Sequence, residues 1–274
     1  MINKVAIQGF EGSFHQVAAQ KFFKELEVIC CSTFREVVKV ASDKKLSNGG
    51  VMAIENSIAG SILPNYNLLQ KSNLKIIGEV YLQIKQNLLV NPGIKLQDIR
   101  EVHSHPMALL QCINYLEKFN WKLIETDDTA LSAKHIHQHK TKHIAAIAST
   151  LAADLYHLEV LTANIHTLKN NYTRFLVLQH EKNIPEIEDA DKASLIFNTD
   201  HSKGSLSKVL TKIAEQDVNL SKLQSMPIPG SDWKYSFNAD LEFETKKQFE
   251  NVIKNIKPLT NDLKVYGIYK NGRS

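Results

Sequence analysis

The sequence predicts an α/β protein in two parts, and three features of the chain carry this prediction. Short apolar strands alternate with helical segments through the first part. A polar stretch containing a proline, residues 179–191, then interrupts the pattern. Beyond it, the segments follow the order β-α-β-β-α-β. Alternating strands and helices are typical of a largely parallel sheet, and the second order is that of a ferredoxin-like split unit.

The expected strands of the first part are residues 5–7, 51–54, 75–80, 86–90, 101–104 and 144–148. The helical patterns between them cover residues 16–26, 33–42, 107–118 and 129–137. In sheets of this kind, ligands collect where loops leave the carboxyl ends of the strands. Polar residues at those strand ends are therefore the first candidates for a functional site.

In the second part we expect a strand at 193–197, a helix at 206–216, strands at 218–225 and 233–243, a helix at 246–256 and a last strand at 263–269. Pro227 and Pro229, followed by Gly230 and Ser231, break the chain between the second and third strands. The predicted domains are residues 1–180 and 192–274, joined by a linker at 181–191.

The composition excludes several classes of protein. The chain has 274 residues, of which 43% are hydrophobic and 23% charged, as in ordinary globular domains. The net charge of +4 is dispersed, so no nucleic-acid partner is expected. Three cysteines do not suggest a disulfide framework, which favours a reducing, cytoplasmic location. Because no uncharged apolar run approaches the length of a membrane span, no membrane association is expected.

Four polar segments lie where loops should meet a cleft. The first, residues 9–14, is a glycine-containing turn in which Ser13 either caps the next helix or helps to hold an anion. The second contains Glu55, Asn56 and Ser57, which could bind a ligand or cap a helix. The third, residues 103–112, ends in Gln111 and Cys112, and the fourth, residues 171–175, is placed just before a terminal strand.

Together and in this order, the segments resemble those of prephenate dehydratases. Residues 171–175 match the family's Asn-aromatic-Thr-Arg-Phe signature, the second segment its Glu-Asn-Ser run and the third its His-Pro…Gln-Cys helix. Residues 145–149, followed by Ala152, Ala153 and Tyr156, also look like the family. Phe10 departs from the family's usual proline, which changes the rigidity of the turn rather than its chemistry.

The resemblance implies a catalytic domain with two lobes, similar to periplasmic binding proteins. It also implies a carbon–oxygen lyase that converts prephenate to phenylpyruvate in phenylalanine biosynthesis, without a metal or other cofactor. The catalytic residue would be Thr173. The residues that would bind the substrate are Ser13, Glu55, Asn56, Ser57, Gln111, Arg174 and Phe175. For Glu55, a structural role in fixing a loop is the alternative.

The second domain resembles an ACT domain, the amino-acid-sensing module of this family. The resemblance implies phenylalanine binding at Gly204, Ser205, Leu206, Gln224, Ser225, Met226 and Pro227, with feedback inhibition. Gln224 and Met226 replace the family's usual glutamate and arginine, so two charged contacts are missing. Because ACT modules commonly pair, a homodimer or homotetramer is expected.

Three other interpretations compete with this one. Arogenate dehydratases share the mechanism, and a non-catalytic amino-acid or solute sensor would keep the cleft without needing Thr173. His135 and His139 stand four residues apart on an expected helix, but no nearby acidic residue or cysteine completes a zinc site, so no metal is expected.

His105 is expected to position the following helix and Cys112 to pack in the core. Mutase activity is not expected, because the chain shows no counterpart of the chorismate mutase fused to some members.

Overall fold

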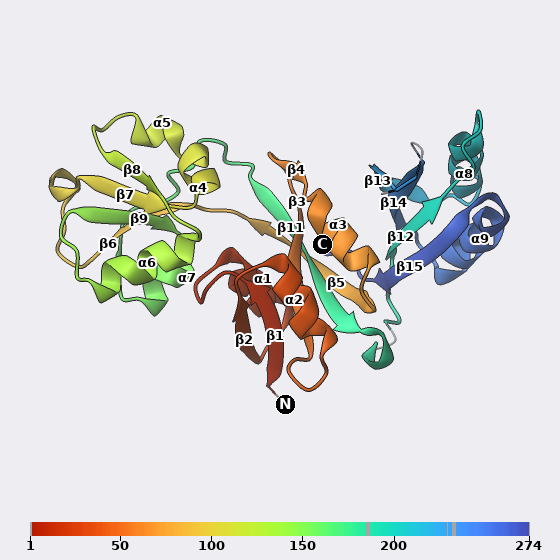
Figure 1. Ribbon diagram of the computed structural model, residues 1–274, viewed down its shortest axis with the longest axis horizontal. Coiled ribbons are helices and arrows are strands. Elements are labelled where there is room, and N and C mark those ends of the chain that lie inside the picture. The colour runs from red at the N-terminus through yellow and green to blue at the C-terminus, as the bar shows by residue number, and fades with distance from the viewer. Residues whose placement is uncertain (1, 185–186, 229, 232–233, 274) are drawn as a thin grey trace. The chain divides into compact units, whose positions relative to one another are not determined.

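The computed structural model describes residues 2–184, 187–228, 230–231 and 234–273 (Figure 1). It divides into two compact units. Unit 1 comprises Met1–Ser72 and Val80–Phe175, and unit 2 comprises Asn73–Glu79 and Leu176–Ser274. Two strands, β5 (Leu74–Gln83) and β11 (Tyr172–His180), therefore contribute residues to both units. The domain boundaries predicted at residues 180 and 192 are not the same as this division into units, and they stay a proposal.

The first lobe of unit 1 is built on a sheet with the strand order β2-β1-β3-β11-β5, on which the short β4 pairs with β3 (Figure 1). Strand β1 runs parallel to both of its neighbours, so that Val5 lies beside Val28 on one side and Gly49 on the other. The new elements of this lobe are β1 (Asn3–Gln8), α1 (Phe14–Phe22), β2 (Leu26–Cys31), α2 (Phe34–Ser42), β3 (Gly49–Asn56), β4 (Gly60–Ser61) and α3 (Leu63–Gln70).

The second lobe of unit 1 has a five-stranded sheet in the order β10-β6-β9-β7-β8. Strand β7 is parallel to β8 and β9, whereas β6 is antiparallel to β9 and β10. Buried aliphatic residues of strands and helices form its core, including Leu88, Val102 and Ile147. The elements are β6 (Asn87–Val90), β7 (Glu101–Ser104), α4 (Pro106–Gln111), α5 (Ile113–Leu116), β8 (Lys122–Glu125), α6 (Thr129–Gln138), β9 (Ile144–Ala148), α7 (Thr150–Leu155) and β10 (Glu159–Thr162), with a 3-10 turn at Leu96–Asp98.

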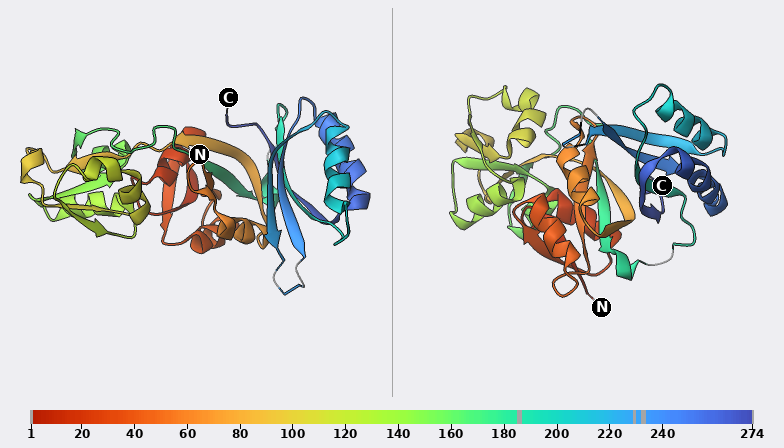
Figure 2. Two further views of the ribbon diagram at one scale, coloured as in Figure 1. Left: turned by 90° about the horizontal axis from the view of Figure 1, so that it is seen from above. Right: turned by 45° about the vertical axis from the view of Figure 1, so that its right-hand side comes forward.

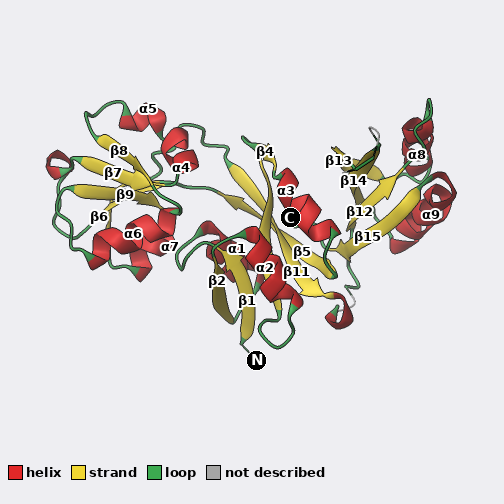
Figure 3. Ribbon diagram, viewed as in Figure 1, coloured by secondary structure: helices red, strands yellow, loops and turns green. Residues whose placement is uncertain are grey.

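Unit 2 confirms the predicted order β-α-β-β-α-β (Figure 3). Its antiparallel sheet has the order β13-β14-β12-β15, and both helices cover one face of it (Figure 2). The core between the helices and the sheet contains Phe197, Val209, Leu241, Phe249 and Ile256. The elements are β12 (Lys192–Asn198), α8 (Ser205–Ala214), β13 (Asn219–Pro227), β14 (Tyr235–Glu242), α9 (Lys246–Ile256) and β15 (Asn261–Tyr269).

Several predicted bounds were wrong. The helix predicted at 16–26 ends at Phe22, because Phe23 is extended, with φ −104° and ψ 129°. The helix predicted at 107–118 is interrupted at Cys112, whose φ of −106° and ψ of 9° lie outside the helical region. In the predicted linker, Glu181–Asn183 form a 3-10 turn, while Pro185 and Glu186 lie outside the described residues. Pro229 and Trp233, the first residue of one predicted strand, lie outside them as well.

No helix in the described part of the chain has the length and apolar character needed to cross a membrane.

Candidate active site

A cavity of about 440 Å³ in unit 1 is lined by residues from both lobes. Five predicted site residues line it: Ser13, Asn56, Gln111, Thr173 and Phe175. The other lining residues are Gln8, Phe14, His15, Phe34, Ala53, Ala59, Ile62, Ile84, Gln86, His105, Met107, Ala108, Asp127, Asp128 and Thr129. Among the described residues, the lining includes no lysine or arginine, and its polar groups are neutral side chains, two histidines and two aspartates. The fold therefore collects residues that are up to 167 positions apart in sequence, from Gln8 to Phe175 (175 − 8 = 167).

A hydrogen-bond network fixes the Thr173 hydroxyl. Asn56 Nδ2 donates to Thr173 Oγ1 over 2.9 Å and to Asn171 Oδ1 over 2.8 Å. Asn56 Oδ1 accepts from the backbone N–H groups of Ile58 and Ala59, both at 2.9 Å. Because backbone N–H groups can only donate, this oxygen cannot exchange places with the nitrogen, and the direction of the bond to Thr173 is determined.

This direction has a chemical consequence for Thr173. A hydroxyl has one proton to donate and lone pairs to accept with. Since Asn56 supplies a donor to Oγ1, the Thr173 proton remains available for another acceptor, and among the described residues no acceptor for it is found. Thr173 is buried but lines the cavity, so that acceptor can be a molecule inside it.

The run that contains Thr173 lies inside strand β11, not before it as predicted. Side chains alternate along a strand, so Thr173 and Phe175 share the face that lines the cavity, while Arg174 points to the other side. Arg174 is 4% exposed, and its Cζ atom lies 5.9 Å from the centre of the Tyr81 ring. The structure therefore places Arg174 behind the cavity wall, and its contact with the substrate stays a prediction.

Glu55 and Ser57 also lie outside the lining. Ser57 Oγ donates to the Asn170 carbonyl over 3.1 Å and accepts from the Tyr172 N–H over 2.9 Å. It therefore holds the approach to β11 in place. Glu55 is paired with Ser61 across the β3–β4 hairpin, next to Asn56. Their direct contact with the substrate stays a prediction, as does the loop-fixing alternative for Glu55.

Ser13 and Gln111 line the cavity from opposite lobes. Ser13 caps α1, and its Oγ accepts from the Gln16 N–H over 3.4 Å, as the capping alternative predicted. Gln111 ends α4, and its Oε1 accepts from Gln86 Nε2 over 3.3 Å. Gln111 therefore keeps its own amide donors for a ligand.

The turn at residues 9–12 joins the lobes within unit 1. Ser149 Oγ donates to the Gly12 carbonyl over 2.6 Å, and Tyr156 OH donates to the Glu11 carbonyl over 2.8 Å. Gly12 has a φ of +89°, and a Cβ atom there would lie 2.9 Å from Cα and Cβ of Ala152. Only glycine fits this position, which explains why the motif at residues 145–156 accompanies the turn.

Sequence reasoning missed several lining residues, above all His15, Gln86, Asp127 and Asp128. Asp128 caps α6 through a bond from the Leu131 N–H at 2.9 Å, and burial raises the pKa of its carboxyl group. Burial lowers the pKa of His15 to about 3. Two sequence signals could have identified these residues. Asp128 is an aspartate directly before a helix, and His15 lies in the first helical turn after a glycine-containing loop. His105 caps α4 by accepting from the Met107 N–H, which confirms its predicted role.

The histidine tract on α6 does not form a larger cluster. The ring centres of His135 and His139 lie 6.2 Å apart. Among the described residues, no three or more His, Cys, Asp or Glu side chains are grouped as metal ligands would be. Cys112 is fully buried in the core of the second lobe, as predicted.

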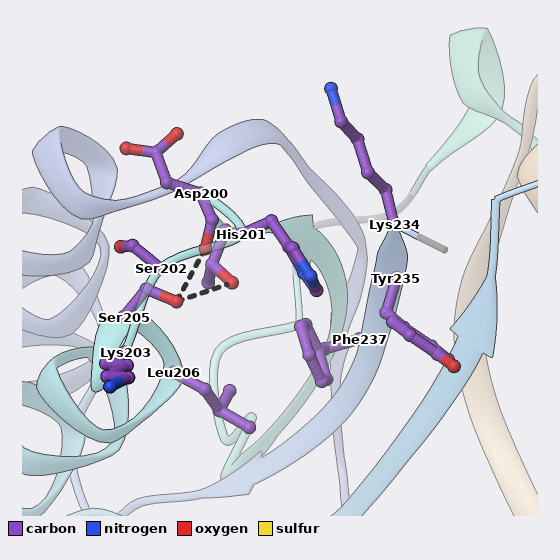
Figure 4. Close-up of a pocket in the computed structure, with 10 residues that line it drawn as sticks. Asp200, His201, Ser202, Lys203, Ser205, Leu206, Lys234, Tyr235 and Phe237 are labelled. Carbon is purple, nitrogen blue, oxygen red and sulfur yellow. Dashed lines mark hydrogen bonds between the residues drawn. The ribbon is translucent and has the colours of Figure 1, made fainter. Parts of the chain in front are cut away.

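A second cavity, of about 360 Å³, lies in unit 2 where β12 leads into α8 (Figure 4). Of the predicted regulatory residues, Ser205 and Leu206 line it, and Gly204 caps α8 with a φ of +78°. The other lining residues are Thr199, Asp200, His201, Ser202, Lys203, Lys234, Tyr235 and Phe237. Ser205 Oγ donates to the Asp200 carbonyl over 2.7 Å and forms a longer hydrogen bond, of 3.2 Å, with the Thr199 hydroxyl (Figure 4).

The remaining regulatory residues, on β13, lie outside this cavity. Gln224 Nε2 donates to the Ser225 carbonyl over 2.9 Å, and the buried Met226 accepts from Asn238 Nδ2 through its sulfur. Pro227 ends the strand. Their part in binding phenylalanine stays a prediction.

Comparison with known proteins gives related sequences along nearly the whole chain. Arogenate dehydratase 2 of Petunia hybrida is 36% identical over 281 residues, covering 97% of this chain and 71% of the relative. The bifunctional chorismate mutase/prephenate dehydratase of Buchnera aphidicola subsp. Acyrthosiphon pisum is 35% identical over 272 residues, covering 95% of this chain and 69% of the relative.

Solved structures have the same fold. The prephenate dehydratase of Staphylococcus aureus subsp. aureus Mu50 is 26% identical, with a TM-score of 0.82 and coverage of 97% of this chain and 100% of that one. A protein described as a novel type of quorum quenching acylase is 27% identical, with a TM-score of 0.88 and coverage of 98% of both chains. The family model for prephenate dehydratase matches residues 5–183. The chain therefore belongs to the prephenate dehydratase family.

Proposed function

We propose that this chain is a prephenate dehydratase, a carbon–oxygen lyase that converts prephenate to phenylpyruvate, CO2 and water. The observation that carries the proposal is the bond from Asn56 to Thr173, which leaves the Thr173 proton available to a molecule in the cavity. Membership of the family supports the reaction class. The cavity supports it too, because its lining offers neutral hydrogen-bonding groups of the kind that this reaction needs.

In the reaction, the bond between the ring and its carboxylate breaks and CO2 leaves. The electrons of that bond restore the aromatic ring as the C–O bond to the ring hydroxyl breaks. The departing hydroxide takes a proton from the solvent pool and leaves as water. Thr173 would donate a hydrogen bond to this oxygen as its negative charge develops, which is where a preorganised donor accelerates a reaction most.

The departing carboxylate needs surroundings that do not hold its charge too strongly. Phe175 and Phe34 line the cavity and supply apolar surface, and no guanidinium or ammonium group of the described part of the chain lines it. The other carboxylate of the substrate would lie near Ser13 at the start of α1, where backbone N–H groups favour an anion. Gln111 would orient the substrate from the second lobe.

The first test is turnover of purified protein with prephenate, measured as phenylpyruvate formed. Thr173→Ala should keep the fold and bind prephenate, but turnover should fall by a factor of about 10²–10³. Near-normal turnover in this variant would remove Thr173 from the mechanism. Prephenate binding without turnover in the wild type would favour the sensor interpretation instead.

Arogenate dehydration is the second candidate function. It is favoured by the similarity to the plant arogenate dehydratase, whose identity of 36% is close to the 35% of the bifunctional prephenate dehydratase. Measuring kcat/KM for both substrates with the same enzyme preparation separates the two.

We also propose that phenylalanine binds to unit 2 and inhibits the enzyme. In the cavity of 360 Å³, Lys203 and Lys234 stand on opposite sides and can attract a carboxylate, while Asp200 can pair with an ammonium group (Figure 4). Leu206 and Phe237 offer apolar surface for the ring. Calorimetry and initial rates with added phenylalanine test binding and inhibition separately. Absence of binding at millimolar phenylalanine would refute the proposal.

A cytoplasmic homodimer or homotetramer remains part of the proposal. Strands β13 and β15 are the edges of the sheet of unit 2, and unpaired edges can join with a second copy of the chain. Light scattering at micromolar concentrations tests this, and a monomer throughout would refute it.

A further inference from the structure

His15 is a partly buried ionisable group in the wall of the active-site cavity that the proposed mechanism does not use. It lies in the first turn of α1. Its ring meets the Phe175 ring edge to face, with centres 5.0 Å apart, and tilts against Phe34 at 5.5 Å. Two aromatic neighbours hold the imidazole in one orientation, so that its two nitrogen atoms have different surroundings.

One ring nitrogen is committed to the protein. The Ala53 N–H donates to His15 Nε2 over 3.4 Å. Because a backbone N–H can only donate, Nε2 must be the unprotonated nitrogen, and the single ring proton then resides on Nδ1. Burial lowers the pKa of this group to about 3, so the ring is neutral at physiological pH.

The other nitrogen, Nδ1, belongs to a ring that lines the cavity. Among the described residues, no hydrogen-bond partner of Nδ1 is found, and this atom is not one of the fully buried unpaired atoms. Nδ1–H is therefore an accessible donor in the wall of the cavity, with no charge and no capacity to accept.

The position of His15 indicates which part of a substrate it meets. Thr173 and Phe175 share one face of β11 and lie about 7 Å apart, two residues along the strand. If the ring hydroxyl of the substrate is at Thr173 and the ring extends along Phe175, then His15, packed on Phe175, would meet the opposite end of the ring. That end carries the side chain in which prephenate has a keto group and arogenate an ammonium group.

We infer that His15 is a specificity-determining residue, whose Nδ1–H donates to the keto oxygen of the substrate side chain and disfavours an ammonium group there. This inference rests on the proposed function. A keto oxygen accepts a hydrogen bond, whereas an ammonium group has only donors and would face the Nδ1 proton without a partner. Sites built to pair with one polar group reject its mismatched analogue because buried groups stay unpaired.

Asp127 is the feature that argues for the opposite preference. Its carboxylate also lines the cavity and could attract an ammonium group. Asp127 is exposed, however, so water screens its charge, and Asp128 is engaged by the Leu131 N–H. The donor at His15 should therefore decide the preference between prephenate and arogenate.

The test compares prephenate with arogenate, using kcat/KM and calorimetric affinity. The proteins are the wild type, His15→Phe, His15→Gln, Asp127→Asn and the control His139→Gln, which changes an exposed histidine. The wild type should prefer prephenate. His15→Phe keeps an aromatic ring but loses the donor, so prephenate kcat/KM should fall by a factor of about 2–12, mainly through KM. Arogenate values should stay within about twofold.

His15→Gln should recover part of the preference for prephenate, because the glutamine amide can accept from the Ala53 N–H and still donate into the cavity. Equal losses for both substrates in His15→Phe, with an unchanged melting temperature, would overturn the inference while leaving the proposed function intact. An arogenate preference that Asp127→Asn abolishes would overturn it as well. If the wild type turned over neither substrate, the proposed function would fail, and the calorimetric ratios would still decide the role of His15.

Discussion

Asn56→Asp tests whether Asn56 sets the direction of the Thr173 hydroxyl. The change replaces the amide nitrogen by an oxygen and keeps the side-chain shape. The acceptor for the Ile58 and Ala59 N–H groups is retained. At the position 2.9 Å from Thr173 Oγ1, however, a donor becomes an acceptor. The Thr173 proton should then turn toward the carboxylate and away from the substrate.

The expected loss of activity follows from the reversed bond to Thr173. Removing one preorganised donor from a developing oxyanion costs a factor of about 10²–10³ in kcat, or roughly 2.7–4 kcal/mol. KM should change little, because the bond matters mainly in the transition state. The fold should tolerate the change, since the buried Asn171 Nδ2 has no partner among the described residues and can rotate to meet the new oxygen.

The assay is steady-state turnover of prephenate by Asn56→Asp, Thr173→Val and the double variant, with circular dichroism as the control for folding. If Asn56 acts through Thr173, the double variant should be no slower than Thr173→Val alone. Independent, multiplying losses would refute the reasoning, as would an Asn56→Asp variant with a normal kcat.

Three further predictions concern stability. Gly12→Ala should lower the free energy of unfolding more than Gly93→Ala in thermal denaturation, because both have positive φ but only Gly12 would clash, with Ala152. Lys192→Met should cost up to about 3–5 kcal/mol in urea denaturation, since it removes the ammonium group 2.9 Å from the buried carboxylate of Glu79, and adding Glu79→Leu should recover much of the loss. His15 has a folded-state pKa of about 3, below its unfolded value of 6.5, so its contribution to stability is complete above pH 6.5 and is lost as the pH falls toward 3. Between pH 7 and pH 5 the wild type should therefore lose up to about 2 kcal/mol more than His15→Gln, and parallel curves for the two proteins would contradict this.

The sequence predicted most strands and helices that have a buried face, although it missed the short helices α3 and α7. The bounds of β7, β9 and α9 agree with the prediction. Strands β2, β8 and β10 were missed, and each lies at the edge of its sheet. Edge strands bury less of their surface, as in β8, where no residue is fully buried. They therefore lack the apolar pattern on which the prediction depended.

The motifs located most of the active site but not the directions of its side chains. Ser13, Asn56, Gln111, Thr173 and Phe175 were predicted and do line one cavity. The separation of Arg174 from Thr173 follows from strand alternation and required knowing that β11 begins at Tyr172. His15 belongs to no recognised motif, and its fixed tautomer depends on Ala53, 38 positions away (53 − 15 = 38), so only the folded chain reveals it.

The two strands that contribute to both units have a consequence for anyone who cuts the protein into pieces. A fragment ending at His180 would keep Leu74–Glu79 but lose the strand β15, whose Gly267 is close enough to Ile76 that a Cβ atom there would overlap the Ile76 carbonyl. It would also lose Lys192, whose Nζ lies 2.9 Å from the Glu79 carboxylate. Such a fragment should be poorly soluble, and an unrelated sensor module could not simply be grafted in its place. Recombination that exchanges unit 2 should therefore succeed only when β5 is exchanged together with the rest of that unit.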